Sequence, residues 1–162
     1  MATLTNLRPC LWFNDQAEEA AELYCSTFPN SKITNVTRYS NAGEEIHGHK
    51  AGSVMTVEFV LDGHAFTGLN GGPMFKFTEA ISFMIDCYDQ KEVDYYTEKL
   101  WDGGQINCGW LKDKFGVSWQ VVPTRLAELL ADKDRVAAER VMTVMLEMGK
   151  LDIAKLEEAY RG

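Results

Sequence analysis

Two histidines stand in a polar stretch of the first half of the chain. His47 and His49 flank Gly48 within the run Ser40–Gly52. In an extended backbone, residues two apart point the same way, so the two imidazoles could bind a metal ion or exchange protons with a substrate. The alternative is that the run is a solvated loop, in which neither histidine has a function.

Four cysteines, which could act as nucleophiles, metal ligands or disulfide partners, stand singly in the sequence. They are Cys10, Cys25, Cys87 and Cys108. No Cys-x-x-Cys pair and no close cysteine–histidine cluster is present, so the spacing typical of a zinc site is absent. We interpret the four as reduced thiols of a cytoplasmic protein, mostly small core residues, with one reactive thiol as the alternative.

Length and composition exclude several classes of function. The chain has 162 residues, of which 46% are hydrophobic and 25% are charged, as in an ordinary soluble domain. No apolar run approaches the ~18 residues of a membrane span, and the N-terminus lacks the basic-then-apolar pattern of a signal peptide. The net charge is −8 and no basic run is present, which argues against nucleic acid as a partner. We therefore expect a cytoplasmic protein with no membrane or nucleic-acid partner.

The first half of the chain is predicted to form a strand, a helix and three further strands. Asn14-Asp15 is expected to cap the helix, whose apolar residues run to Phe28. Asp62-Gly63 suits a tight turn between the last two strands. The expected strands cover Leu7–Phe13, Lys32–Tyr39, Val54–Leu61 and Ala65–Leu69, and Ser40–Gly52 is expected to be a loop.

The same order of elements starts again after Pro73. An Asp-Gln-x-Glu motif recurs at residues 15 and 89, an offset of 74. We interpret each half as strand–helix–strand–strand–strand, the product of an internal duplication. In the second half the helix is expected over Asp89–Trp101, and strands over Ile81–Cys87, Ile106–Leu111 and Val117–Val122.

From Thr124 the pattern becomes wholly helical. Met142, Met145 and Met148 recur at three-residue spacing and give this tail a broad apolar surface. We interpret that surface as core or subunit packing, with a methionine-lined ligand groove as the alternative. The expected helices cover Arg125–Ala131, Asp134–Met148 and Asp152–Tyr160, the last two capped by their aspartates.

Six segments spread over the chain resemble the PhnB-like family of the vicinal oxygen chelate superfamily, which also contains glyoxalase I, bleomycin-resistance proteins and extradiol dioxygenases. Members of this family are often named 3-demethylubiquinone-9 3-methyltransferases. The resemblance covers nearly the whole chain. The segments that carry it are Pro9–Phe13, Phe28–Ile33, Leu69–Pro73, Trp110–Asp113, Gly116–Pro123 and Met148–Ile153.

The resemblance implies an α+β fold in which two βαβββ modules form a curled, cup-like mixed sheet. It also implies assembly as a homodimer. Applied to this chain, it predicts one domain over residues 1–162, with module one at 6–79, module two at 80–123 and a helical tail at 124–162.

In the metal-using members of the superfamily, four inward side chains, typically His and Glu, hold a divalent ion that acts as a Lewis acid. The matching positions in this chain are Arg8, Thr67 or Gly68, Ala80, and Gln120. None of them is His, Asp or Glu, and an arginine cation cannot ligate a metal. We therefore expect the cup without the ion, and we predict no cofactor.

The remaining cup residues suit a small organic ligand, since they combine aromatic and apolar groups with a few polar ones. Strand alternation places Arg8, Cys10 and Trp12 on one face, and Trp119 is expected in the core. Arg8 and Gln120 could hold a carboxylate or carbonyl oxygen, although Arg8 could also be solvated or paired with a carboxylate. The predicted ligand-binding residues are Arg8, Cys10, Trp12, Phe66, Gly68, Asn70, Ser82, Met84, Ser118 and Gln120.

Three hypotheses follow for the function. The first is a protein that binds a small organic molecule in its cup without a metal, with catalysis left open. The second is a metal-assisted isomerase, lyase or dioxygenase with a displaced site at His47 or His49. The third is a dimeric scaffold whose methionine-rich tail mediates association. Methyl transfer is not supported, because the glycine-rich stretch Gly68–Gly72 does not join a strand to a helix.

Overall fold

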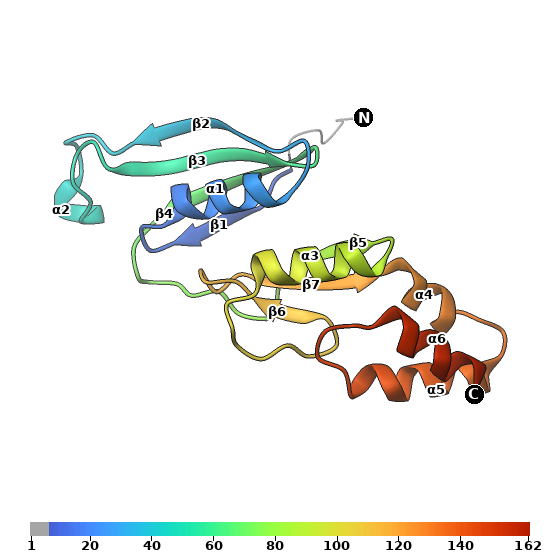
Figure 1. Cartoon of the computed structure of the whole chain (residues 1–162). Helices are drawn as coiled ribbons and strands as arrows, with labels where there is room; N and C mark the ends of the chain where they lie inside the picture. The colour runs from blue at the N-terminus through green and yellow to red at the C-terminus, as the bar shows by residue number, and fades with distance from the viewer. Residues whose placement is uncertain (1–6) are drawn as a thin grey trace, which may run out of the picture. The chain divides into compact units, whose positions relative to one another are not determined.

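The computed structural model describes residues 7–162, so residue 6, where module one was predicted to begin, lies outside the described residues. The chain divides into two compact units, one ending at Lys76 and the other covering Phe77–Gly162 (Figure 1). Within residues 7–162, none of the helices is long and apolar enough to cross a membrane.

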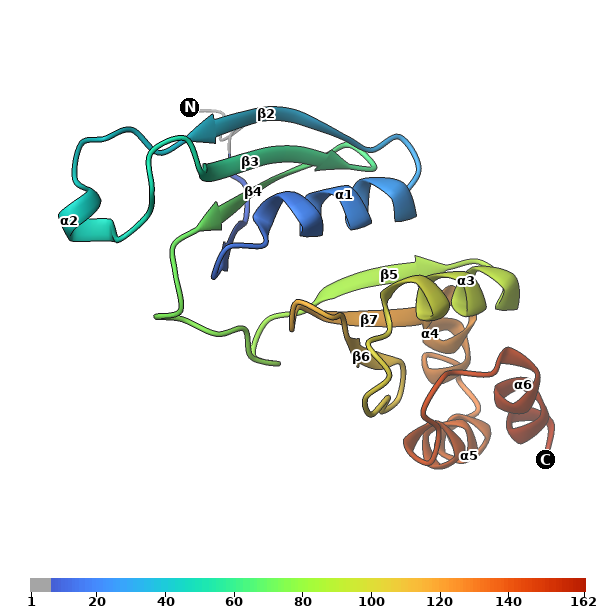
Figure 2. The ribbon, with the colours of Figure 1, turned by 60° about the vertical axis from the view of Figure 1, so that its left-hand side comes forward.

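The first unit contains a four-stranded sheet in the order β1-β4-β3-β2, with one long helix packed on it. β1 runs parallel to β4, and the other neighbours are antiparallel. The helix α1 (Ala17–Thr27) covers one face of the sheet (Figure 2). The strands are β1 (Cys10–Phe13), β2 (Lys32–Arg38), β3 (Val54–Leu61) and β4 (His64–Asn70).

The core of this unit lies between α1 and the sheet, because both elements bury residues at their own period. Ala17, Ala20, Ala21 and Tyr24 recur on one side of α1 and are fully buried. Alternate residues of β3 and β4 are buried as well, and the Tyr24 ring lies 6.1 Å from the Phe59 ring. The predicted strand–helix–strand–strand–strand order is therefore present here.

The cap of α1 differs from the prediction. Neither Asn14 nor Asp15 caps the helix, and the residue at the N-cap position, Gln16, makes no side-chain capping bond. Instead, the Ala17 amide donates to Oδ1 of Asn70 at 2.8 Å, from the end of β4. The amide side chain of a residue distant in sequence replaces the local cap. The sequence of residues 14–16 therefore does not predict this cap.

The polar stretch between β2 and β3 also departs from the predicted loop. It contains a short helix, α2 (Glu44–His47), with Gly43 and Gly48 at its two ends. Both glycines have positive φ, of 84° and 72°, a backbone region that glycine enters without steric penalty. The two glycines therefore start and stop one helical turn within an otherwise irregular segment.

The second unit contains a three-stranded sheet in the order β5-β7-β6, with α3 packed against all three strands. The Asp89 side chain caps α3 by accepting from the Glu92 amide, as the sequence predicted. The elements are β5 (Phe83–Cys87), α3 (Gln90–Leu100), β6 (Trp110–Lys112) and β7 (Ser118–Pro123).

This sheet corrects the prediction of a second βαβββ module, because its described residues form one strand fewer. The strand expected over Ile106–Leu111 begins only at Trp110. Gly103, Cys108 and Gly109 all have positive φ, which turns the backbone repeatedly and prevents an extended run before Trp110. Only an isolated bridge joins Asn107 to Trp110.

Asp113 holds the turn between β6 and β7. Its buried carboxylate accepts from the amides of Phe115 and Val117 at 2.9 and 3.0 Å, and from the Trp119 indole at 2.9 Å. A buried charge needs such donors to offset its lost hydration. Trp119 is therefore held in the core, as the sequence predicted.

Three helices follow β7: α4 (Thr124–Leu130), α5 (Arg135–Leu146) and α6 (Ile153–Arg161). Asp134 and Asp152 cap the second and third, in agreement with the prediction. The three helices enclose a small core of buried apolar side chains, which comprises Leu126, Leu129, Val141, Leu151 and Leu156.

Replacing Asn70 tests the cap that α1 receives from the sheet. We expect Asn70→Ala to lower the free energy of unfolding by about 2–4 kcal/mol, because Ala17 N and Val54 O both lose a buried partner. Urea denaturation followed by circular dichroism measures the change. Asn14→Ala is the control, with an expected loss below about 0.5 kcal/mol, since its exposed side chain makes a long hydrogen bond of 3.4 Å to the neighbouring Asp15. Equal losses in the two variants would contradict the assignment.

Candidate functional site

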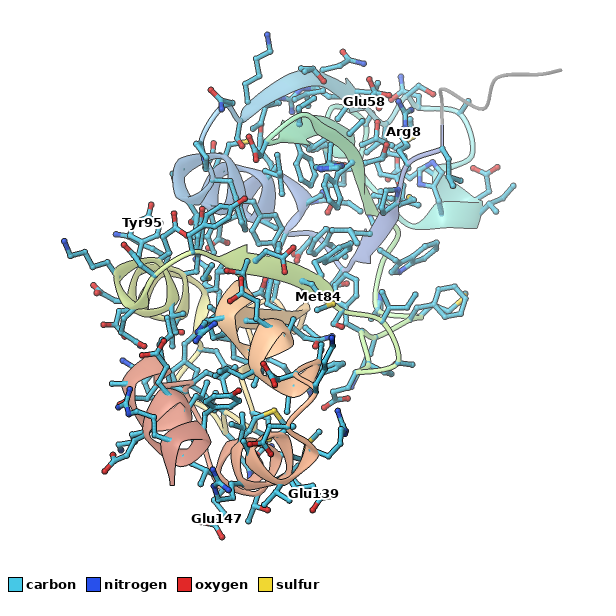
Figure 3. All side chains as sticks on the ribbon, turned by 90° about the vertical axis from the view of Figure 1, so that its right-hand side faces the viewer. Arg8, Glu58, Met84, Tyr95, Glu139 and Glu147 are labelled. Carbon is cyan, nitrogen blue, oxygen red and sulfur yellow. The ribbon has the colours of Figure 1, made fainter. Side chains whose placement is uncertain are left out.

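The face of the first sheet that lies opposite α1, here called the first open face, carries polar and aromatic side chains. Arg8, just before β1, donates to Oε1 of Glu58 on β3 at 2.8 Å (Figure 3). Their side chains are 48% and 31% exposed, so the pair is accessible to solvent. The residues of this face are Cys10, Trp12, Thr56, Glu58, Thr67 and Leu69.

Trp12 is held against the segment that follows β4. Its indole donates to the carbonyl oxygen of Gly72 at 2.8 Å, and its ring lies 4.9 Å from that of Phe75. A Cβ atom at Gly71 would lie 2.3 Å from the indole, so only glycine fits beneath it. The predicted ligand-binding side chain is therefore fixed in orientation by contacts of its own.

Three predicted residues of β4 lie on the other side of the sheet. Phe66 stacks on Phe59 in the core, and a Cβ atom at Gly68 would lie 3.1 Å from Ala17 of α1. Asn70 is buried by its capping role. The prediction that placed Phe66, Gly68 and Asn70 on the face of Arg8 is wrong, because strand alternation puts Thr67 there instead.

Glu58 is a residue of the first open face that the sequence analysis missed, whereas Thr67 was named there as the alternative to Gly68. They are direct cross-strand partners, and Thr67 also pairs with Cys10. The signal was present, since a two-residue turn at Asp62-Gly63 sets this register. The Thr67 hydroxyl oxygen is buried and has no hydrogen-bond partner among the described residues.

On the second sheet, the face opposite α3 brings together the predicted Ser82, Met84, Ser118 and Gln120. The Gln120 amide nitrogen donates to the Ser82 hydroxyl at 2.8 Å. Met84, the register partner of Gln120, is 61% exposed and projects from β5 in Figure 3. Ser118 and Gln120 lie two residues apart on β7, so they share this second open face.

A cavity of about 270 Å³ lies against β6, β7 and the loop before β6. Ser118 is 2% exposed, and its hydroxyl oxygen has no hydrogen-bond partner among residues 7–162. An unpaired buried hydroxyl costs about 1–3 kcal/mol, so this one is a group that a ligand would satisfy. The lining residues are Glu79, Asp102, Gly104, Gln105, Asn107, Trp110, Leu111, Lys112 and Ser118.

The charges of this cavity centre on an ion pair between Lys112 and Glu79. The Lys112 hydrogen bond lowers the pKa of the Glu79 carboxyl, which keeps this carboxyl in its charged form. Asp102 adds a second acidic group, whose Oδ1 accepts from the Gly104 amide at 2.7 Å. The side chains lining the cavity therefore carry one more negative than positive charge.

His47 and His49 do lie together, but through Tyr39 rather than along an extended strand. The Tyr39 ring lies 4.5 Å from each imidazole, and burial raises the pKa of its hydroxyl, which donates to the carbonyl oxygen of Asn70. Nδ1 of His47 already accepts from the His49 amide. The geometry favours aromatic packing over the displaced metal site.

The side chains at the positions that the resemblance matched to metal ligands do not fit a divalent ion. Arg8 is paired with Glu58, Ala80 offers no side-chain donor atom, and the Gln120 amide binds Ser82. Within the described part of the chain, no group of three or more His, Cys, Asp or Glu side chains is placed to hold a metal.

Each unit has a mixed sheet covered by one helix, and the chain as a whole is similar in fold to a PhnB-like protein. A PhnB protein from Bacillus cereus, named as a 3-demethylubiquinone-9 3-methyltransferase, is 32% identical to this chain. The match covers 74% of this chain and 100% of the relative, with a TM-score of 0.64. The model of the 3-demethylubiquinone-9 3-methyltransferase family matches residues 5–122, and the chain belongs to this family.

A more distant structure agrees in fold. Protein PA1353 from Pseudomonas aeruginosa is 18% identical, with a TM-score of 0.57 over 73% of this chain and 98% of its own. None of the curated proteins matches the chain. The family model ends at residue 122, so the helices α4, α5 and α6 lie beyond the matched region.

The cysteines differ in a way that alkylation can measure. Burial, together with Glu92, Asp86 and Asp89, raises the pKa of Cys87 to about 12. At about pH 8, roughly one such thiol in ten thousand is the reactive thiolate, so we expect iodoacetamide to modify the exposed Cys10 long before Cys87.

A time course of peptide mass spectrometry on the folded protein follows the two sites. The same reaction in urea is the control, since unfolding removes the burial and brings the two rates together. Equal rates in the folded protein would mean that Cys87 is not protected as described.

Proposed function

We propose that the chain binds a small organic molecule on the open faces of its sheets without a metal ion. The observation that carries this proposal is the buried, unpartnered hydroxyl of Ser118 in the wall of a 270 Å³ cavity. Lys112 and Trp110 line the same cavity and supply a charged donor and an aromatic surface. The rest of the lining is mainly polar, so the cavity can both hold an aromatic group against Trp110 and orient polar groups of a ligand.

The metal-free part of the proposal is supported by the donor set. A Lewis-acid site needs several anionic or imidazole ligands, whereas Arg8, Ala80 and Gln120 provide none. Binding needs only complementary shape and charge. The open face of the second sheet supplies such a lining within one unit.

The family's name refers to methyl transfer, but the local backbone supports binding rather than that activity. A nucleotide-type methyl donor is usually held by a glycine-rich turn between a strand and a helix. Here Gly71 and Gly72 follow β4 and lead through irregular backbone toward β5. The indole of Trp12 already occupies the space beside Gly71.

A ligand screen tests the binding proposal. We expect a thermal-shift screen of small acids and aromatic compounds to raise the melting temperature with at least one class of compound. We also expect NMR amide shifts to map that compound to β6 and β7. Gln120→Ala should weaken its binding about tenfold, because one oriented hydrogen-bonding group of the second open face is lost.

Gln16→Ala is the matched control, since Gln16 is exposed and makes no side-chain capping bond. Its affinity for the same compound should equal that of the unmodified protein. A screen in which no compound shifts the amides of β6 and β7 would contradict the proposal.

Elemental analysis tests the metal-free state. We expect the purified protein to contain less than about a tenth of an equivalent of zinc, nickel, manganese or iron, because residues 7–162 contain no group of three or more His, Cys, Asp or Glu side chains placed to hold a metal. Dialysis against each metal, followed by desalting, should leave this content unchanged. Retention of one equivalent that a His47→Ala variant loses would favour the metal-dependent enzyme instead.

A further inference from the structure

Lys112 and Ser118 stand directly opposite each other on neighbouring strands. They are register partners between β6 and β7, and both line the cavity described above. Side chains at such positions leave the sheet about 5 Å apart, on the same face. A lysine ammonium and a serine hydroxyl are therefore placed to donate to the two oxygens of a single carboxylate.

The two donors are in different states. The Ser118 hydroxyl is buried and has no hydrogen-bond partner in the described part of the chain. The Lys112 ammonium is paired with the carboxylate of Glu79, whose side chain is 62% exposed. The ion pair lowers the pKa of Glu79, which keeps this carboxylate charged. An exposed ion pair contributes little to stability, so replacing its acidic partner costs little free energy.

We propose that the cavity binds a small aromatic monocarboxylate, whose carboxylate replaces that of Glu79 on Lys112 and accepts a hydrogen bond from Ser118. This inference rests on the proposed binding function and assigns its ligand class. The Glu79 carboxylate then competes with the ligand's carboxylate for Lys112, and it leaves Lys112 when the ligand binds.

The remaining charges restrict the ligand to one negative charge. Once Glu79 has moved away, the cavity retains Lys112 and Asp102, whose charges balance. A dianion such as a phosphate monoester would bring a second negative charge beside Asp102 with no cation to meet it.

The rest of the cavity wall suits the body of such a ligand. Trp110 offers an aromatic surface to a planar group. Gln105 and Asn107, which bond to each other at 2.9 Å, offer amide groups to polar substituents. The volume of 270 Å³ lies just below the usual range of about 300–1,000 Å³ for drug-sized ligands, so the ligand is small.

The test titrates the full chain with benzoate and with its neutral analogue benzamide, following backbone amides by NMR. We expect benzoate to shift the amides of Lys112 and Ser118 and to bind at least about tenfold more tightly than benzamide. Glu79→Gln should strengthen benzoate binding about threefold to fivefold, because the competing carboxylate is removed. Asp94→Asn is the matched control, since it removes an exposed acid paired with a different lysine, Lys150.

The donor variants complete the test. Lys112→Met should weaken benzoate binding at least about tenfold, and Ser118→Ala should weaken it severalfold, with melting curves confirming that both variants fold. Unchanged or weaker benzoate binding by Glu79→Gln overturns the proposal that Glu79 competes with the ligand for Lys112.

Two further outcomes separate this inference from the function on which it rests. Equal affinity of benzoate and benzamide at the same amides overturns the carboxylate assignment but leaves small-molecule binding intact. If neither compound shifts these amides, the carboxylate assignment is overturned. If no compound of the wider screen shifts them either, the proposed binding function is contradicted as well.

Discussion

The first unit depends on the side chain and backbone of one residue, Asn70. Its Oδ1 accepts from the first amide of α1, its Nδ2 donates to Val54 O at the start of β3, and its own carbonyl accepts from the Tyr39 hydroxyl. One buried amide therefore ties a helix, two strands and the loop after β2 to each other. Because a buried amide with missing partners is costly, these four elements cannot shift independently. The position of α1 on one face of the sheet leaves the other face open.

The composition of each open face follows from register. The two-residue turn at Asp62-Gly63 pairs Glu58 with Thr67, and the short β6–β7 connection held by Asp113 pairs Lys112 with Ser118. A slip of one residue in either hairpin would turn these polar groups into the core. In the second unit, Asp113 thus fixes the neighbouring elements by hydrogen bonds, as Asn70 does in the first. Each is a buried polar side chain whose hydrogen bonds decide which residues face outward.

Most elements could be predicted from the sequence, because their signals are local. Alternation identified β3 with its exact bounds, and Asp89, Asp134 and Asp152 cap their helices as predicted. The failures have separate causes, one of which is contact with residues distant in sequence. Asn70 caps α1 from 53 residues away, and positive φ values at Cys108 and Gly109 end the extended run expected before Trp110. The face of Arg8, Cys10 and Trp12 was predicted, but Phe66 and Gly68 were placed on it by choosing the wrong parity along β4.

The cavity could not be predicted for the same reason, since Glu79, Asp102 and Ser118 meet only in the folded second unit. Its charges fit a chain whose net charge is −8, because such a chain repels free anions from its surface. An ion pair on Lys112 further means that an inorganic anion must displace Glu79 while gaining no contact with the ring of Trp110. A carboxylate attached to an aromatic ring gains contact with both the Lys112 ammonium and the Trp110 ring. The cavity then distinguishes an aromatic carboxylate from an inorganic anion by the extra contact with Trp110. The acidic character of the chain favours such selective binding over binding of any anion.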